Sequence, residues 1–499
     1  MKKFILLALI LSLAAAPVLS CVSDEPESNG ANQNVPENAG EPVTGPDGTN
    51  EEPGGETSPE LTFPDLPDVD FGGYEFRIWN TGAGVQAWIM TQLLAEEETG
   101  QALNDSIFRR NRRIEERFGF TLVQRDFQGA GFVRDAARPS IAAGADDFDL
   151  AMINPMYAVI MAQDGHIVML DTLPHIDLSQ PWWDQDMIRD FSIGGRVFFA
   201  TGDFSFNHYS VTIGTLFNKQ IHADLGLDCP YTLVHEGRWT LERFAEMGRA
   251  GLVDLNGDGI FDRNDQWGLA ATTANYTQAI MNGLGARYIT KDANDIPVLN
   301  LNTQGFIERF QTAFDVLTEG WVFDYSRPNT GETAFNMFST NRALFWINPI
   351  HRAVDLRAMD NDFGILPQPK LNEQQPYHIS ATVVPHVKTI PVTAPDLERT
   401  GIILEALNAE SRMTTLHIYY DIMLVNQVMN RDEESAGMLE IMFSNRVYEL
   451  GRLYWNTQVA DPIQHAMRDF NREIVSVIEA REAAAVAAID AAISTFLED

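Results

Sequence analysis

The segments Thr215-Leu216-Phe217-Asn218-Lys219 and Glu236-Gly237-Arg238-Trp239-Thr240 set the fold expected for this chain of 499 residues. Residues 215–217 form a short β-rich run, and residues 241–250 carry apolar side chains at helical spacing. From Tyr74 onward, short β-rich runs alternate with amphipathic helices. This alternation predicts an α/β fold with a mostly parallel sheet. The other expected strands are 74–79, 121–124, 148–153 and 197–200, and the other expected helices are 305–317, 396–410 and 471–496.

A clear helix lies between the first two expected strands. Ile107, Ile114 and Phe118 sit at helical spacings, and Gly119 follows them as a C-cap. The same helix carries a basic cluster that resembles a nucleic-acid patch, formed by Arg109, Arg110, Arg112 and Arg113. Because Glu115 and Glu116 lie alongside these arginines, we expect a solvated outer face instead.

The first twenty residues have the layout of a secretory signal peptide, 1–20. Lys2 and Lys3 precede an apolar stretch, 4–19, that falls short of the roughly 20 residues needed to span a membrane. The sequence Val18-Leu19-Ser20-Cys21 resembles a bacterial lipobox, which implies cleavage before Cys21 and a lipid, including palmitate, on this residue. The alternative is a secreted protein that is cut after Ala16.

The segment after Cys21 is expected to be a tether. Residues 22–60 hold ten Asp or Glu, six Pro and six Gly, with no Lys, Arg or aromatic residue. This composition cannot bury a core, so we predict a disordered acidic linker over 21–66. A flexible coil of this length spans roughly 35 Å, which lifts a domain clear of a membrane surface.

The rest of the chain is strongly acidic. Residues 61–499 contain 60 acidic and 33 basic residues, which argues against nucleic acid or anionic lipid as a partner. We therefore expect contact with a membrane only through the N-terminal lipid. Cys229 is the one cysteine of this part, so the fold is expected to form without disulfides, with Cys229 as a small apolar residue.

The segment from Asp254 to Asp265 fits an EF-hand-type loop. Oxygen-bearing side chains stand at positions one, three, five, nine and twelve, and Gly259 at position six permits the sharp turn. The expected Ca²⁺ ligands are Asp254, Asn256, Asp258, the Ile260 carbonyl, Asp262 and Asp265. We expect a structural ion, because one unpaired loop cannot act as an opening sensor. The alternative is a polar turn that binds no ion.

Several segments in order along the chain resemble bacterial extracellular solute-binding proteins of family 1, which are related in fold to maltose-binding protein. The strongest is the run from Thr215 to Thr240 quoted above. The others are Asn104-Asp105, Pro181-Trp182-Trp183-Asp184, Gln266-Trp267-Gly268-Leu269 and Phe363-Gly364-Ile365-Leu366-Pro367-Gln368-Pro369. The resemblance covers nearly all of residues 74–455.

This resemblance implies a two-lobed periplasmic-binding-protein-like fold of class II, with a ligand cleft between the lobes. Transferred to this chain, lobe 1 would comprise 67–201 and 377–425, and lobe 2 would comprise 202–376 and 426–499. The implied function is capture of a sugar or oligosaccharide and its delivery to the permease subunits of an ABC importer. The protein is then expected to be a monomeric lipoprotein on the extracytoplasmic face of the cell membrane.

A sugar cleft needs aromatic platforms for the C–H face of a ring and polar groups for its hydroxyls. Ligands of open α/β lobes lie beyond the carboxyl ends of strands. On this basis the expected ligand-binding residues are Trp79, Asn80, Asn154, Tyr157, Trp183, Asp203, Tyr276, Trp346, Asn348 and Tyr377. For each aromatic residue the alternative is packing in the core.

Two other classes of protein remain as alternatives. A surface glycoside hydrolase needs a pair of carboxylates, but 70 acidic residues supply pairs by chance. No zinc-helix, nucleophile-elbow or phosphate-loop motif is present, so no catalytic residue is assigned. A surface sensor or adhesin of the same fold is the second alternative, which the sequence does not separate from an importer subunit.

Overall fold

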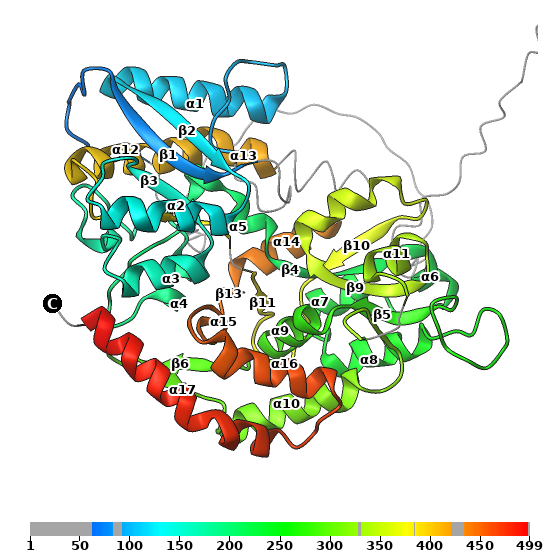
Figure 1. The fold of residues 1–499 in the computed structure, drawn as a ribbon. Coiled ribbons are helices and arrows are strands. Elements are labelled where there is room, and N and C mark those ends of the chain that lie inside the picture. Colours follow the sequence, from blue (N-terminus) through cyan, green and yellow to red (C-terminus); the bar gives the residue numbers. More distant parts are fainter. Residues whose placement is uncertain (1–61, 83–91, 328–330, 384, 421–433, 498–499) are drawn as a thin grey trace, which may run out of the picture. The chain divides into compact units, whose positions relative to one another are not determined.

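The computed structural model describes residues 62–82, 92–327, 331–383, 385–420 and 434–497. The signal peptide, Cys21 and most of the predicted linker lie outside these residues. The described residues belong to one compact unit, Leu61–Asp499, which contains two larger sheets with helices packed on each (Figure 1). Within this part of the chain, no helix is both long and apolar enough to cross a membrane.

The first sheet has the strand order β12-β3-β1-β2. Strands β1 (Tyr74–Thr81), β2 (Phe120–Phe127) and β3 (Leu150–Ile153) are parallel, and β12 (Val387–Thr389) joins β3 in the antiparallel direction. The predicted strands 74–79, 121–124 and 148–153 are therefore confirmed. Since side chains alternate along a strand, Ile78 and Met152 pack with helices α1 and α12, whereas Trp79 and Ile153 pack with α2 and α3.

The second sheet has the order β10-β4-β9-β5-β8. Its strands are β4 (Ile213–Asn218), β5 (Trp267–Ala271), β8 (Val322–Asp324), β9 (Ala343–Pro349) and β10 (Phe363–Leu366). Strands β5, β8 and β9 are parallel, while β4 runs antiparallel to both of its neighbours. One face packs on α8 and α10 and the other on α11, so both faces of this sheet are covered.

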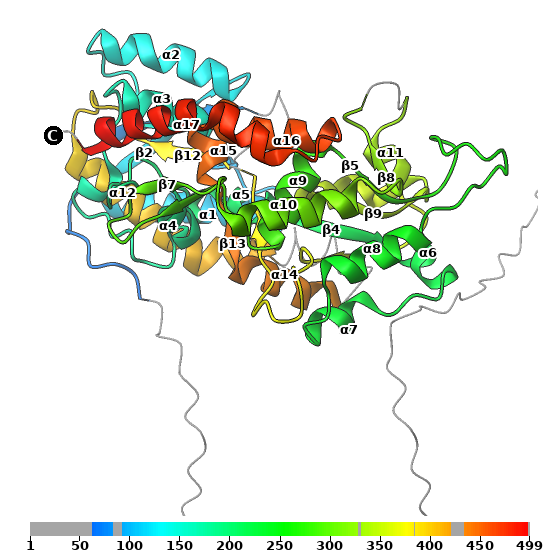
Figure 2. The same cartoon turned by 90° about the horizontal axis from the view of Figure 1, so that it is seen from below.

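The helices, in chain order, are α1 (Ala102–Phe118), α2 (Ala130–Ala142), α3 (Pro155–Gln163), α4 (Gln185–Phe191), α5 (Asn207–Ser210), α6 (Lys219–Asp224), α7 (Pro230–His235), α8 (Leu241–Ala250), α9 (Thr273–Gly283), α10 (Gln304–Leu317), α11 (Ala334–Ser339), α12 (Leu397–Glu410), α13 (Leu416–Tyr419), α14 (Glu434–Ser444), α15 (Leu450–Tyr454), α16 (Asp461–Arg468) and α17 (Ile474–Leu497). The five helices predicted from sequence all form. Figure 2 shows the long α17 beside α16, with which it packs.

Three segments that run between the two sheets lie side by side. Thr212 pairs with Thr382 in an isolated bridge, and the backbone N–H of Thr382 donates to the carbonyl of Val447 at 3.0 Å. Strand β11 (Ser380–Ala381) pairs with β13 (Arg446–Val447) at the same place. Elsewhere, a second small sheet joins β6 (Ile289–Lys291) to β7 (Pro297–Leu299). Within the described residues, the segments around Thr212, Thr382 and Val447 thus meet at one junction between the two sheets.

The expected strand at 197–200 is wrong. Only Ala200 pairs there, in an isolated bridge to Lys388. The N–H of Val197 donates to the carboxylate of Asp171, and its carbonyl accepts from Leu170, so these groups are satisfied by a turn and not by a ladder.

The expected solvated face of α1 is wrong for Arg110 and Glu115. Arg110 is 1% exposed and donates to the carbonyls of Leu93, at 2.6 Å, and Phe204, at 3.3 Å. Its guanidinium lies over the Phe204 ring, and burial lowers the pKa of Arg110 to about 9. The other three arginines are exposed and paired with acids, namely Arg109 with Glu98, Arg112 with Glu115 and Arg113 with Glu410.

Candidate functional site

Asp203 lies at the junction of the crossing segments, in the short helical turn Asp203–Ser205 after the bridge of Gly202 to Trp183. Its side chain is 2% exposed and contacts the guanidinium of Arg412 at 3.3 Å. Burial raises the pKa of Asp203 to about 7, although Arg412 and Lys388 act in the opposite direction. These two basic residues thus counter only part of the effect of burial on this carboxyl.

Arg412 connects this buried carboxylate to the protein surface. Its side chain is 27% exposed, and its Nη1 also donates to the hydroxyl of Tyr209 at 3.2 Å. Arg412 lies in a π-helical turn, Ser411–Thr415, that follows α12. Such turns are rare and frequently mark functional sites.

Three aromatic rings pack beside Arg412. The ring centroid of Tyr209 is 5.1 Å from that of Tyr420 and 5.4 Å from that of Phe443. Tyr420 and Phe443 are half-buried, so part of each ring faces outward. An acid–arginine pair beside aromatic faces can bind the hydroxyls and the C–H face of a sugar.

A second cluster of buried polar residues, built around Asp184, lies near Asp203. Arg446 contacts both oxygens of Asp184, at 3.1 and 3.0 Å, and the hydroxyl of Tyr448 donates to Asp184 at 2.7 Å. His208 lies near both this cluster and Asp203, with its Nε2 3.6 Å from an Asp203 oxygen. Burial lowers the pKa of His208 to about 3. Its ring is therefore neutral, and the contact with Asp203 is not an ion pair at neutral pH.

The four predicted ligand residues from the first sheet share its carboxyl edge. Asn80 is buried and its Oδ1 accepts from the N–H of Thr81, while Asn154 caps α3 by accepting from Met156. Tyr157 is half-buried with Arg134 stacked over its ring at 4.3 Å. The ring of Trp79 is 5% exposed and stacks on Phe148.

The other predicted aromatic residues are mostly in the core. Trp183 and Trp346 are each 1% exposed, and Trp183 donates to a Glu405 oxygen at 2.9 Å. Tyr276 is fully buried and donates to Asp324 at 3.1 Å. These three rings pack in the core in this structure, as the alternative for each aromatic residue expected. Their contact with a ligand stays a prediction.

Asn348 and Tyr377 complete the predicted set. Asn348 is half-buried in β9 opposite Gly214 of β4. Tyr377 is 52% exposed and lies at the rim of a separate hollow in the second sheet's helices. The structure thus brings Asp203 together with Arg412, Tyr209 and Tyr420, which no sequence motif marks, and leaves Tyr377 elsewhere.

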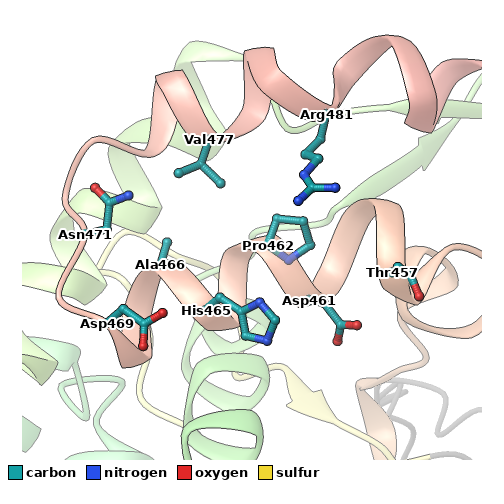
Figure 3. A pocket seen from close by; sticks show the side chains of 9 residues that line it. All are labelled: Thr457, Asp461, Pro462, His465, Ala466, Asp469, Asn471, Val477 and Arg481. Carbon is teal, nitrogen blue, oxygen red and sulfur yellow. The ribbon is translucent and has the colours of Figure 1, made fainter.

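Another cavity, of about 280 Å³, lies between α16 and α17 (Figure 3). Arg481 and Val477 project from α17 toward Pro462 on α16, with His465 and Asp461 below. None of the residues predicted from sequence lines this cavity.

The Asp254–Asp265 loop is held by its own side chains. Both carboxylate oxygens of Asp254 accept backbone N–H groups, from Gly257 at 2.7 Å and Gly259 at 2.8 Å, and these bonds lower the pKa of Asp254. Asp265 is fully buried and accepts from Leu255 and Asp262. The oxygens proposed as ligands thus line one turn, but no three acidic, His or Cys side chains of the described residues lie close enough to hold a metal ion.

No protein-family model and no curated protein sequence matches the chain. Solved structures do match it. UspC from Mycobacterium tuberculosis aligns with a TM-score of 0.55 at 13% identity over 83% of this chain and 100% of that chain. UgpB from the same organism, in complex with glycerophosphocholine, gives 0.54 at 14% identity over 84% and 99%. The ABC substrate-binding protein Lmo0181 from Listeria monocytogenes, in complex with cycloalternan, gives 0.52 at 11% identity over 84% and 99%.

The chain therefore has the two-lobed, periplasmic-binding-protein-like α/β fold that the sequence motifs predict. At these identities the likeness concerns the fold, and the ligand of this chain has to be argued from its own residues.

Proposed function

We propose that this protein is an extracytoplasmic solute-binding lipoprotein that captures a sugar or oligosaccharide for an ABC importer. The observation that carries the proposal is the shared fold with an ABC substrate-binding protein solved in complex with cycloalternan. The fold alone does not select the ligand, because UgpB has it and was solved with glycerophosphocholine. The choice of a sugar rests on the chemistry of the junction.

The proposed ligand contacts are the exposed edge of Arg412, its partner Asp203, and the rings of Tyr209 and Tyr420. Arg412 and Asp203 place N–H donors and carboxyl oxygens side by side, and this combination suits the hydroxyl groups of a sugar. Asn80, Asn154, Tyr157 and Asn348 are proposed as further contacts from the edges of the two sheets. Capture would proceed by closure of the lobes around the bound sugar.

Calorimetric titration with mono- and oligosaccharides tests this proposal. We expect one sugar to bind, and we expect Asp203→Asn to weaken its binding at least tenfold, since the arginine loses its carboxylate partner. Asp315→Asn is the matched control, because Asp315 pairs with Arg472 on an exposed helix surface. Binding of peptides or amino acids, with no heat from any sugar, would overturn the carbohydrate assignment.

The proposed anchor is a lipid on Cys21, which lies outside the described residues. A tether of roughly 35 Å would keep a monomeric binding protein concentrated near its permease. The mass of the mature N-terminal peptide tests this part: an unmodified peptide that begins at Pro17 would contradict it.

Calcium in the Asp254–Asp265 loop is a separate proposal. The ion would replace N–H groups as the partner of Asp254, Asn256 and Asp258, with Asp262 and the Ile260 carbonyl supplying further oxygens. We expect 1 mM CaCl₂, about a hundredfold above a dissociation constant near 10⁻⁵ M, to stabilise the fold by about 2–3 kcal/mol. Thermal melting with CaCl₂ or EDTA measures this. Equal melting temperatures in the two buffers, or the same calcium response in Asp254→Ala, would contradict the site.

A glycoside hydrolase and a sensor or adhesin remain as competing functions. One of the structural neighbours named above, Lmo0181, is an ABC substrate-binding protein, which favours binding over hydrolysis. Release of free sugar from an oligosaccharide by the purified chain would favour the hydrolase. Sugar binding by the purified chain, with equal uptake of that sugar in a permease-deficient cell and in its parent, would favour the sensor.

A further inference from the structure

A hollow of about 320 Å³ lies at the C-terminal end of α9, and neither Asp203 nor Arg412 is among its lining residues. Its walls come from the end of α9, from α10 and from the loop that precedes β11, and they include Leu284, Arg309, Asn372 and Tyr377. Tyr276, near the start of α9, is eight residues before Leu284, or about 12 Å along the helix. The hollow therefore shares no lining residue with the contacts proposed at the junction, although its wall ends next to β11.

Arg309 is fixed in one orientation at the wall of this hollow. Its Nε donates to the carbonyl of Leu284 at 2.8 Å, and its Nη1 donates to the carbonyl of Gly305 at 2.9 Å. No carboxylate contacts it among the described residues, and its remaining N–H groups have no protein partner there. A half-buried arginine held this way offers donors to a ligand at little cost in side-chain entropy.

The loop that carries Tyr377 is rigid. The side chain of Gln375 donates to the carbonyls of Gly283 at 2.8 Å and Tyr377 at 3.0 Å, and it accepts from the N–H of Leu371 at 3.0 Å. The ammonium of Lys370 donates to the carbonyl of Gln375 at 2.9 Å. These bonds fix the backbone at Gln375 and Tyr377, so the chain that carries the ring is held in place before any ligand arrives.

The Tyr377 ring presents an apolar face to solvent. It is 52% exposed, and none of the ring contacts between described residues involves it. Leu284, Leu371 and Ile379 supply apolar carbon beside it. Tyrosine commonly occupies such positions, where one side of a site is apolar and the other is wet.

We propose that this hollow is a second carbohydrate site, which takes one pyranose ring. The C–H face of the sugar would lie on Tyr377, and its hydroxyls would accept from Arg309 and bond to the amide of Asn372. The volume is at the lower end for small-molecule sites, which fits a single ring and not an extended oligosaccharide. The proposal goes beyond capture at the junction and does not depend on it.

Saturation-transfer NMR on the mature chain tests the second site, with glucose, galactose, mannose and xylose as probes. We expect transfer to at least one of them, a loss of fivefold or more in both Tyr377→Ala and Arg309→Ala, and nearly unchanged transfer in Tyr377→Phe, which keeps the ring. Because Tyr377 is half exposed, its alanine variant is expected to melt at the wild-type temperature, which is checked in parallel.

Asp203→Asn separates the two sites. Transfer that persists in Asp203→Asn but is lost in Tyr377→Ala supports the hollow, whatever binds at the junction. Transfer that is lost in Asp203→Asn and kept in Tyr377→Ala overturns the second site and leaves the proposed function standing. Absence of transfer from all four sugars to the wild-type chain also overturns it.

Discussion

Replacing Arg446 by methionine is expected to lower the free energy of unfolding by about 3–5 kcal/mol, because the change leaves a buried carboxylate without its cation. The side chains of Arg446 and Asp184 are 6% and 0% exposed, and the guanidinium contacts both oxygens of Asp184. Burial alone would raise the pKa of Asp184, but Arg446 and the hydroxyl of Tyr448 hold it below its usual value. Urea unfolding of the wild type and the variant at pH 7 measures the difference.

The matched control is Arg472→Met. Arg472 also forms two contacts with one carboxylate, that of Asp315, but the two side chains are 52% and 54% exposed. Such a pair contributes about 0–1 kcal/mol. The double variant Arg446→Met/Asp184→Leu is expected to recover much of the loss, since it removes the unpaired charge. Equal losses in Arg446→Met and Arg472→Met would show that burial of the Asp184 pair has no special role in stability.

Local signals are what the sequence predicts well. Gly119 ends α1 with φ of 61°, a left-handed conformation that glycine adopts without strain. Thr240 and Asn218 cap α8 and α6 by accepting from the N–H three residues on. Each of these capping residues is next to its helix in the sequence. The residues that form the cap can therefore be recognised in one short stretch.

The junction could not be predicted in this way. Asp184 and Arg446 are 262 residues apart, and the alternation of strands and helices says nothing about which polar residues meet when the chain crosses between sheets. Asp203 was predicted from its place in a loop, but its partner Arg412 lies in the π-helical turn after α12, a position that no motif marks. A partner can be identified only when the register of both crossing segments is known.

The tryptophans show a second limit. Trp79, Trp183 and Trp346 were expected at strand ends or in loops, where ligand contacts lie, but Trp79 and Trp346 are inside β1 and β9 and all three rings are buried. A strand end places a residue near the edge of a sheet, but the alternation of side chains decides whether it faces a helix or the ligand. Arg110 is the converse case, a charged residue on an apparently solvated helix that is buried because backbone carbonyls satisfy its donors.

His386 is expected to make this protein sensitive to acid. The residue is 1% exposed, immediately before β12, and neither ring nitrogen has a hydrogen-bond partner within the described residues. Burial lowers the pKa of His386 from 6.5 to about 4. Between these two pH values the unfolded chain binds a proton at this residue that the folded chain does not, so the stability it contributes is present above pH 6.5 and is lost as the pH falls toward 4.

A shift of this size corresponds to about 3 kcal/mol between pH 7 and pH 4. Other buried groups titrate in the same range and not all with the same sign, since burial raises the pKa of Glu405 to about 7 and lowers that of His351 and His378 to about 4. The difference between the wild type and His386→Leu isolates the one group. We expect the two to differ by no more than about 1 kcal/mol at pH 7, because the two nitrogens have no bond to lose, and the variant to be more stable by about 2–3 kcal/mol at pH 4.5.

Urea unfolding at the two pH values measures this difference, with His465→Leu, an exposed position on α16, as the control that keeps the wild-type response. A constant difference between wild type and His386→Leu from pH 7 to pH 4.5 would mean that His386 is hydrated or paired when folded. A difference that grows as the pH falls places the cost beside β12, which pairs with β3 in the first sheet. The carboxyl edge of that sheet carries the proposed ligand contacts Asn80 and Asn154. Acid would then loosen the first sheet at the edge where the sugar is expected to bind.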